Sequence, residues 1–458
     1  MEYEVVVVGA GIGGLTTASL LAARGVNVCL LERQSRVGGC VADFEHLGYA
    51  FEPTAGLYSG WEPGGTYEQI FSELPITPPK VNPLSPAYVV RLPDATEIVV
   101  GEGESQLDGD LRRAFPECAE QAVSFYRQLA DFHKADHSTI TNLSGCSLRF
   151  RRFIDVQLQS FTQRSSDQLP FEETARALTL PLRGLWGIDG GGQALADAFA
   201  ESLKKCGGSL RLNSPVLRLA YGSDGQPIGV DLLSGERVLA GRAIVSNLTI
   251  WDTYGKLIGL ARTQPSVLSE LKQLQGWGAY LLFLSMDQDA VHRLKSNRMI
   301  LLTDWQEGDN YSPEHAQIVF AAADSETRAP QGKFAVTVST FTDPEDWFAF
   351  HEDQSAHEEK DQETLEFIWN RLHSAVPELG DSVEVIETST PRTFYETTRR
   401  KFGMLGRPRH STEGVFGDSA RTLFPNVFIV SDTVSSRPGI EGVSESAKAL
   451  ADLIRPIC

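Results

Sequence analysis

The sequence predicts an α/β fold with more than one domain, and three observations lead to that prediction. The chain has 458 residues, which exceeds the roughly 250 to 300 residues at which a single hydrophobic core stops growing. It opens on a short apolar strand that runs into a glycine-rich turn and a helix. Apolar strand-like runs lie between helical patterns, which predicts a mixed sheet with helices, near residues 278–286, 299–302, 318–323 and 334–341.

The first 32 residues predict a strand, a tight turn, a helix and a second strand. Val5–Val8 is a run of four β-branched residues, typical of a strand buried on both faces. An apolar-periodic helix over 15–24 and a strand over 27–31 that ends in Glu32 follow a turn that contains Gly9, Gly11, Gly13 and Gly14. The glycines let the backbone approach a pyrophosphate at the helix N-terminus, and Glu32 can accept hydrogen bonds from a ribose. We therefore expect a Rossmann-type dinucleotide-binding domain.

Composition and charge argue against several other classes of protein. The formal net charge of −19 argues against sequence-independent binding to nucleic acid, which needs clustered Lys and Arg. Six scattered cysteines without a CxxC pair predict neither a zinc site nor a disulfide framework. His133 and His137 have helical i, i+4 spacing, but no third ligand accompanies them, so no metal is expected. No signal segment or 18-residue apolar run occurs, which predicts a soluble cytoplasmic protein.

The segment after Glu32 distinguishes between dinucleotides. Gly38–Gly39 and the stretch GYAFEPTAGLYSG at 48–60 resemble the FAD-dependent amine-oxidase superfamily. That resemblance implies bound FAD, with Arg33, Gly38 and Gly39 near its adenosine and pyrophosphate. It also implies that Gly56 and Leu57 approach the isoalloxazine ring. Cys40 stands where many relatives have Arg, so this chain lacks that phosphate contact, and a covalent bond from Cys40 to the flavin is not expected.

Two more blocks extend the resemblance. The segment 426–454 predicts a strand, a loop with Asp432 and an amphipathic helix; in the superfamily the acid binds the ribityl chain and the helix start faces the flavin. The segment 186–247 predicts a glycine turn, a helix and hairpins around Gly225 and Gly235; in relatives the residue matching Val216 binds adenine through its backbone. The predicted cofactor-binding residues are Gly9, Gly11, Ile12, Gly13, Gly14, Glu32, Arg33, Gly38, Gly39, Gly56, Leu57, Val216, Asp432, Ile440, Gly442 and Val443.

Because both ends of the chain contribute to one nucleotide site, the FAD-binding domain is expected to be discontinuous. We assign 1–80, 184–248 and 392–458 to it, and 81–183 and 249–391 to a substrate domain with a mixed sheet and a helical lid. Helices are expected near 117–131 and 147–163 in that second domain. The acidic stretch 343–361 is expected to be a solvated surface segment that opens a helix.

The block LRFRRFIDVQLQSFTQ at 148–163 and the following LTLPLRGLWGIDGGGQALADAF resemble the branch of carotenoid desaturases, carotenoid isomerases and retinol saturases. This implies oxidoreductase chemistry at CH–CH or C=C bonds of a long apolar isoprenoid or polyene. Alternatives are an amine or porphyrinogen oxidase, a non-catalytic FAD-bearing carotenoid carrier, and a polyunsaturated fatty-acid isomerase. The isomerase needs a cation for a carboxylate, for which the candidates are Arg149, Arg151, Arg152 and Arg183.

Several further residues have both a functional and a structural interpretation. Glu441 is the one candidate for proton transfer. Its structural interpretation is an acidic residue that interacts favourably with the dipole at a helix N-terminus. Tyr58, Trp186 and Trp277 are candidates for the wall of a substrate channel, and otherwise core residues. The basic, aromatic segments 148–153 and 392–410 are candidates for peripheral membrane contact, with Gly403–Gly406 as an alternative cofactor contact. The sequence carries no signal for an oligomeric state.

Overall fold

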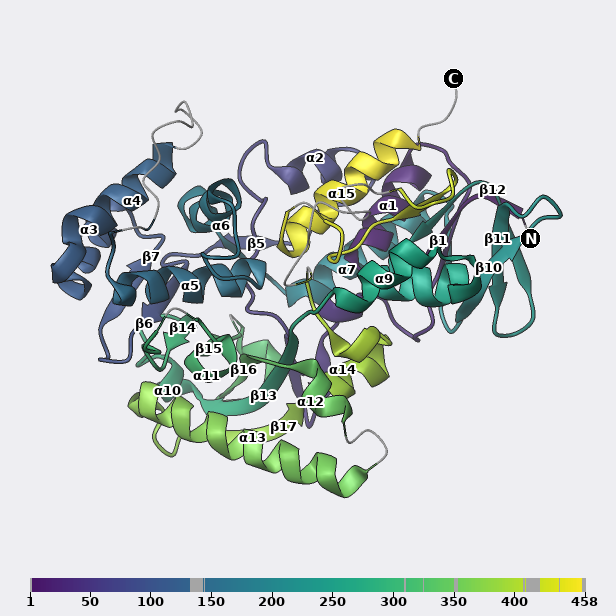
Figure 1. Cartoon of the computed structure of the whole chain (residues 1–458). Coiled ribbons are helices and arrows are strands. Elements are labelled where there is room, and N and C mark those ends of the chain that lie inside the picture. Colours follow the sequence, from purple (N-terminus) through teal and green to yellow (C-terminus); the bar gives the residue numbers. More distant parts are fainter. Residues whose placement is uncertain are drawn as a thin grey trace.

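The computed structural model describes residues 2–131, 143, 145–308, 310–323, 325–349, 353–406, 408, 421–435 and 437–454. Two seven-stranded sheets organise these residues, and helices cover both of them (Figure 1). Each sheet forms one lobe, and a group of helices extends the second lobe (Figure 1). The predicted α/β class, with a Rossmann-type domain and a mixed-sheet domain, is confirmed.

The first sheet contains the predicted strand–turn–helix–strand unit. Its order is β10-β11-β12-β1-β2-β9, with β18 paired to β12. β1 pairs in parallel with β12 and β2, and α1 (Ile12–Ala23) joins β1 to β2. Since β1 is flanked on both sides and covered on both faces, Val5–Val8 are buried as predicted. The strands are β1 (Glu2–Val8), β2 (Val28–Leu31), β9 (Ser209–Arg211), β10 (Val216–Tyr221), β11 (Pro227–Leu232), β12 (Arg237–Ser246) and β18 (Val427–Ile429).

Alternate residues of β1 face two different cores. Val5 and Val7 pack against one group of helices, and Val6 and Val8 pack against another on the opposite face. The first group comprises α1, α2 (Thr66–Ser72), α7 (Gly191–Lys205) and α15 (Gly439–Leu453). The second comprises α8 (Ile250–Asp252), a π-helical turn (Thr253–Gly259) and α9 (Pro265–Gln273). The segment after residue 249, which was assigned to the second domain, therefore packs on the first sheet, and the second lobe resumes near β13 (Gly278–Asp287).

The second sheet has the order β17-β13-β16-β15-β14-β6-β7. All four predicted apolar runs are strands of it, at the predicted positions to within about two residues. β6 and β7 form a hairpin that adds to β14 in parallel, and neither was predicted. The strands are β6 (Tyr88–Arg91), β7 (Glu97–Val100), β13 (Gly278–Asp287), β14 (Arg298–Leu302), β15 (Gln317–Ala322), β16 (Lys333–Thr342) and β17 (Val383–Ser389).

Helices cover the second sheet on one face and at one end. α13 (Gln354–Ala375) lies along one face, where Ile368 and Leu372 enter the core. Short helices accompany it: α10 (Gln288–Val291), α11 (Pro313–Ala316) and α12 (Pro344–Phe348). The helical group at the end near β6 and β14 comprises α3 (Glu104–Ala114), α4 (Ala119–Asp131), α5 (Leu148–Thr162) and α6 (Phe171–Arg183). Of the predicted surface segment 343–361, the described part is not fully solvated, because Trp347 is buried in the core between α13 and the sheet.

The segment 148–153 does not form the predicted membrane-contact surface. It is the first turn of α5, where Phe150 and Phe153 are fully buried in the helical core. The Arg152 side chain is buried as well and donates to the Gly308 carbonyl oxygen at 2.6 Å. Because the rings point inward, they cannot enter a headgroup layer. Among the residues that the structure describes, no helix has the length and apolar character needed to span a membrane.

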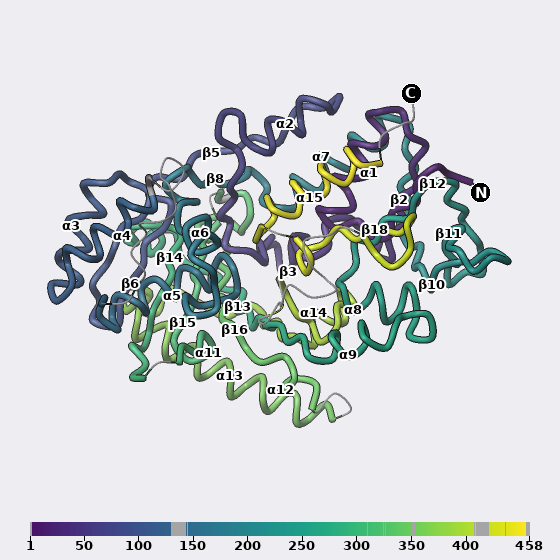
Figure 2. The backbone as a smooth tube through the Cα atoms, turned by 45° about the horizontal axis from the view of Figure 1, so that its top comes forward, coloured from purple at the N-terminus to yellow at the C-terminus, as the bar shows by residue number. Residues whose placement is uncertain are grey.

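Segments distant in sequence connect the lobes. The hairpin of β3 (Phe44–His46) and β4 (Tyr49–Phe51) packs its rings on β13, although it lies within the predicted nucleotide-binding segment 1–80. A ribbon of β5 (Val81–Pro83) and β8 (Trp186–Ile188) lies where the chain enters and leaves the helical group. α14 (Pro391–Thr398) leads from β17 back to the first lobe. Figure 2 shows α1 and α15, from opposite ends of the chain, side by side.

A buried ion pair at the end of the second sheet predicts a pH-dependent contribution to stability. Glu97 and Arg91 are both 8% exposed, with Nη2 and Oε1 2.5 Å apart. Burial alone would raise the pKa of Glu97, but hydrogen bonds from Lys295 and Arg91 lower it below its ordinary value of 4.5. A lowered carboxyl pKa stabilises the fold above about pH 4.5, and this stabilisation is lost as the pH falls through the lowered value.

We therefore expect Glu97→Gln to lower Tm at pH 7 by about 2 to 4 °C, and by less at pH 3.5. Thermal unfolding at the two pH values measures the difference. Glu120→Gln, which removes the carboxylate of an exposed pair with Arg112, is the control and should leave Tm nearly unchanged. A Tm difference for Glu97→Gln that is the same at both pH values would contradict the assignment.

Candidate functional site

A cavity of about 1250 Å³ lies between the two lobes. It exceeds the roughly 300 to 1,000 Å³ typical of small-molecule sites. Its wall is formed by the β1–α1 turn, the segment after β2, the start of α15, strands β13 and β17, and α14. The predicted cofactor-binding residues that line it are Gly9, Gly11, Ile12, Gly13, Glu32, Arg33, Gly38, Gly39, Val216, Asp432, Ile440 and Val443. The structure thus brings twelve of the predicted residues, from four separate parts of the sequence, to one space.

The glycine turn needs its glycines because Asn247 lies directly behind it. A Cβ at Gly11 would come within 2.6 Å of Asn247 Oδ1, and one at Gly13 within 2.8 Å of Asn247 Nδ2. Asn247 also lines the cavity and is held by its own backbone N–H, which donates to the Val8 carbonyl oxygen at 2.8 Å. Asn247 was not predicted, since nothing local in the sequence marks an Asn at the end of a strand as the support of a turn about 235 residues earlier.

The two glycine segments pack against each other through backbone. The Gly38 N–H donates to the Ala10 carbonyl oxygen at 2.9 Å, and a Cβ at Gly39 would lie 3.2 Å from Gly11 Cα. Gly11 is the N-cap of α1 and, as a glycine, has no side chain to cap the helix, so the first N–H groups of this helix are available to an anion. Gly11, Gly13 and Gly39 all line the cavity, and this glycine cradle suits a pyrophosphate.

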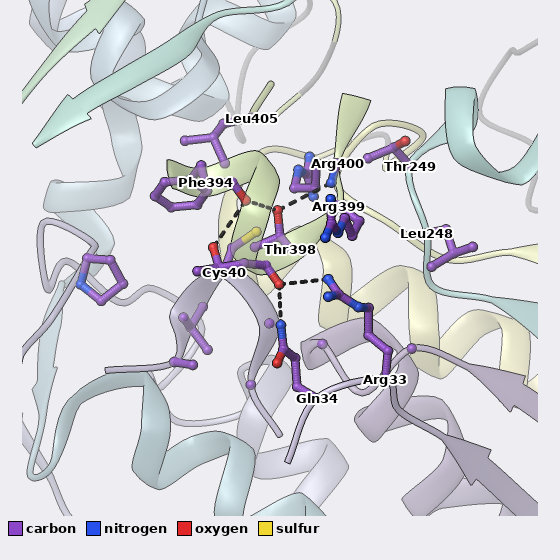
Figure 3. A pocket seen from close by; sticks show the side chains of 18 of the residues that line it. Arg33, Gln34, Cys40, Leu248, Thr249, Phe394, Thr398, Arg399, Arg400 and Leu405 are labelled. Atoms are coloured by element: carbon purple, nitrogen blue, oxygen red, sulfur yellow. Dashed lines mark hydrogen bonds between the residues drawn. The ribbon is translucent and has the colours of Figure 1, made fainter. Parts of the chain in front are cut away.

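Glu32 and Arg33 have partners within the protein. The Glu32 carboxylate accepts from the backbone N–H of Ala10 at 2.7 Å and of Gln34 at 2.8 Å. Arg33 Nη1 donates to the Thr397 carbonyl oxygen at 3.0 Å, and Gln34 Nε2 donates to the same oxygen. Figure 3 shows Arg33 and Gln34 pointing toward the segment that carries Thr398 and Arg399. The end of α14 therefore closes over this side of the cavity.

Asp432 is held by an arginine that the sequence analysis did not select. Arg400 Nη2 lies 2.8 Å from Asp432 Oδ2, and the Gly406 N–H donates to the same oxygen at 2.9 Å. Burial lowers the pKa of Arg400, but Asp432, Cys40 and Asp252 together raise it by more, so the net shift is upward. Burial raises the pKa of the nearby Cys40 thiol, with Arg400 opposing that shift. The guanidinium is therefore charged and the thiol neutral at neutral pH.

The start of α15 faces the cavity, but Glu441 does not. Gly439, Ile440 and Val443 line the cavity. Glu441 is buried against α2, where it accepts a hydrogen bond from Thr66 Oγ1 at 3.1 Å. The geometry favours the structural interpretation of Glu441 over proton transfer.

Four predicted cofactor residues and all three predicted channel residues lie outside the cavity lining. Gly14 and Gly442 are packing positions, since a Cβ at either would collide with a backbone carbonyl oxygen. Gly56 accepts from Arg298 Nε at 3.0 Å, and Leu57 packs against the helical core. Among the channel candidates, Tyr58 and Trp186 exchange backbone hydrogen bonds of 3.0 and 2.8 Å, and Trp277 bridges to Leu405. None of these three residues lines this cavity, so their place in a channel wall stays a prediction.

The apolar wall of the cavity comes instead from the β3–β4 hairpin and β13. The rings of Phe44 and Phe283 stack with centroids 4.7 Å apart. Both line the cavity, together with Leu281 and Phe394. Neither phenylalanine was predicted, because an alternating strand pattern does not reveal which face meets a cavity.

The four arginines proposed for a fatty-acid carboxylate do not line the cavity. Arg149 pairs with Asp94 at 2.7 Å, and Arg183 lies 3.4 Å from Glu62. The basic residues that do line it are Arg33, Arg36, Lys256, Arg399 and Arg400. Leu405 and Gly406 line it too, in agreement with the alternative interpretation of Gly403–Gly406. No group of three or more potential metal ligands occurs among the described residues; His133 and His137 lie outside them.

One cavity is surrounded by a Rossmann-type glycine turn, two helix N-termini and a wall from the second sheet. This arrangement is that of a dinucleotide-dependent oxidoreductase. Comparison with known sequences identifies the group. The chain belongs to the family described as flavin containing amine oxidoreductase, whose profile matches residues 12–455. The protein is an FAD-dependent enzyme of this family. The cradle formed by Gly11, Gly13 and Gly39 fits a dinucleotide pyrophosphate, since it lines the cavity at the uncapped N-terminus of α1.

Two relatives and one solved structure show how far the similarity extends. The chain is 26% identical over 496 residues to prolycopene isomerase 2 of an Oncidium hybrid cultivar, covering 97% of this chain and 82% of that protein. It is 25% identical over 500 residues to the all-trans-retinol 13,14-reductase of Danio rerio, covering 93% and 82%. An oxidoreductase from Methanosarcina mazei has the same fold, with a TM-score of 0.74 and 17% identity over 99% of this chain and 100% of that one.

Proposed function

We propose that the protein catalyses an FAD-dependent reaction at CH–CH or C=C bonds of a long apolar isoprenoid or polyene. The observation that carries this proposal is the continuity of the cavity from the glycine turn of α1 to the stacked Phe44 and Phe283. A polyene needs an apolar wall beside the flavin, and aromatic rings pack well against a flat conjugated chain. The names of the two relatives, a prolycopene isomerase and a retinol reductase, support the same substrate class.

The residues of the chain have separate tasks in this proposal. The glycine cradle and the N-termini of α1 and α15 hold the cofactor's anionic part. When bound, the flavin accepts or donates hydride at a substrate carbon. Leu281, Phe283 and Phe394 orient the apolar substrate and exclude water from it.

The fatty-acid alternative would require one of the cations that line the cavity to bind a carboxylate. Arg33 donates to the Thr397 carbonyl oxygen, and Arg36 donates to the Asp43 carbonyl oxygen. Lys256 pairs with Asp252 at 2.7 Å. These pairings favour a neutral apolar substrate over a carboxylate.

The test is an anaerobic assay with four substrates on the purified full chain after its flavin spectrum has been recorded. The substrates are a poly-cis carotene, all-trans-retinol, linoleic acid and putrescine, and the products are identified by chromatography and mass spectrometry. Conversion of either polyene supports the proposal. It is contradicted if putrescine bleaches the flavin, if linoleic acid alone is isomerised, or if no polyene changes with either oxidised or pre-reduced flavin.

The apolar wall gives a prediction for substrate affinity. We expect Phe283→Asp to raise the KM for the polyene at least tenfold, about 1.4 kcal/mol, because a carboxylate would replace a ring stacked on Phe44. Phe283→Leu keeps the apolar contact and should change KM by only a few-fold. Phe367→Asp introduces the same charge at a ring that is 45% exposed on α13 and serves as control. Equal KM values for the two Asp variants, with FAD content unchanged, would contradict the assignment of this wall.

A further inference from the structure

A single arginine is built into the cavity wall beside the glycine segments. Arg400 directly follows Arg399, the left-handed C-cap of α14. Its side chain is 12% exposed and its guanidinium is anchored twice. Nε donates to the Met404 carbonyl oxygen at 2.6 Å, and the two Nη atoms donate to Asp432 Oδ1 at 3.1 Å each. A guanidinium fixed at both its Nε and Nη edges is preorganised, so binding an anion costs it little side-chain entropy.

Arg400 faces the residue that follows the second glycine segment. Its charge acts on the Cys40 thiol, next to Gly39, where it opposes the rise in pKa that burial causes, and both residues line the cavity. In Figure 3, Thr398 is drawn between Arg400 and Cys40. A neutral thiol is a weak acceptor, so an anionic oxygen at this point would be a stronger partner for the guanidinium.

The other basic residues that line the cavity are less suited to this task. Arg36 is exposed and donates to the Asp43 carbonyl oxygen at 2.6 Å. Arg33 and Arg399 are close neighbours. Burial is the largest cause of the lowered pKa of Arg33, and the positive charge of Arg399 is the second largest. Lys256 pairs with Asp252. Arg400 alone among them combines burial, a rigid fork and proximity to Gly39.

We propose that Arg400 binds the pyrophosphate of the dinucleotide and that Asp432 positions it, so that the cation comes from the end of α14 instead of from position 40. Cys40 and Arg400 are 360 positions apart in the sequence, and both line the cavity. This inference concerns the cofactor and holds whichever substrate the enzyme takes.

The test uses apoprotein and three probes: FAD, ADP and riboflavin. ADP contains the pyrophosphate without the flavin, and riboflavin contains the flavin without the pyrophosphate. We expect Arg400→Ala to weaken FAD and ADP binding by about 10- to 100-fold, the range of one charge-assisted hydrogen bond, and riboflavin binding by less than threefold. Fluorescence titration or calorimetry gives the dissociation constants.

Two further variants separate phosphate binding from a folding effect. Cys40→Arg combined with Arg400→Ala returns a guanidinium to the same place from the other segment, and we expect it to recover at least half of the lost ADP affinity on a logarithmic scale. Arg399→Ala removes an exposed neighbouring charge and should weaken ADP binding by less than threefold. The proposal is overturned if Arg400→Ala binds ADP as the wild type does, if riboflavin is weakened equally, if Arg399→Ala has the same effect, or if Cys40→Arg fails to restore affinity.

Discussion

Gly14→Ala is expected to weaken FAD binding by at least about 100-fold, which corresponds to about 2.7 kcal/mol. The reason is a steric clash and not a backbone conformation, because Gly14 has helical geometry in the first turn of α1. A Cβ at this position would collide with the carbonyl oxygen of Gly9 and lie 3.1 Å from Asn247 Cβ. A backbone oxygen cannot rotate away, so the start of α1 would have to move out of the turn. The flavin absorbance of the purified variant and an FAD titration of its apoprotein measure the loss.

The matched control is the same substitution in another helix. Gly109 lies in α3, is exposed, and has no atom within 4 Å of an added Cβ. Gly109→Ala is therefore expected to stabilise the fold by about 0.5 to 1 kcal/mol through helix propensity and to leave FAD affinity unchanged. If Gly14→Ala also kept its FAD, the tight packing of α1 on the turn would not be required for cofactor binding.

The parts of the fold that were predicted correctly have local causes. The β1–α1–β2 unit follows from a valine run, glycines at fixed spacing and an apolar period, all within 32 residues. The strands of the second sheet follow from uninterrupted apolar runs. The placement of Ile250–Gln273 could not be predicted, because its apolar residues could cover either sheet. That choice depends on which sheet face is still uncovered, and tertiary packing decides it.

The candidate site likewise contains some residues that sequence motifs mark and others that only long-range contacts place. The glycines, Glu32 and Asp432 belong to motifs, and the structure brings these residues to one cavity. Asn247 and Phe283 have no motif, since each contacts a segment more than 200 residues away, and Arg400 lies in no motif although its partner Asp432 does. The aromatic residues Tyr58 and Trp186 do not line this cavity, and composition does not distinguish a ring that faces a cavity from one that supports it. Long-range contacts decide both points.

Asp432→Ala is expected to lower the free energy of unfolding of the apoprotein by about 2 to 4 kcal/mol. This is less than the loss expected for a fully buried ion pair, because the side chains of Arg400 and Asp432 are 12% and 30% exposed. The loss arises because the guanidinium of Arg400 would remain in the cavity wall without its carboxylate. Removing the charge as well, in Arg400→Met combined with Asp432→Ala, leaves no unpaired ion and should be less destabilising than the sum of the two single variants. Urea unfolding of the wild type, the two single variants and the double variant gives the coupling energy.

The control is Glu172→Ala, which breaks an exposed pair with Arg176 on α6 and should lower the free energy of unfolding by less than about 0.5 kcal/mol. Strict additivity in the cycle would mean that Asp432 does not hold Arg400, and the phosphate-binding role of Arg400 would then need a different anchor.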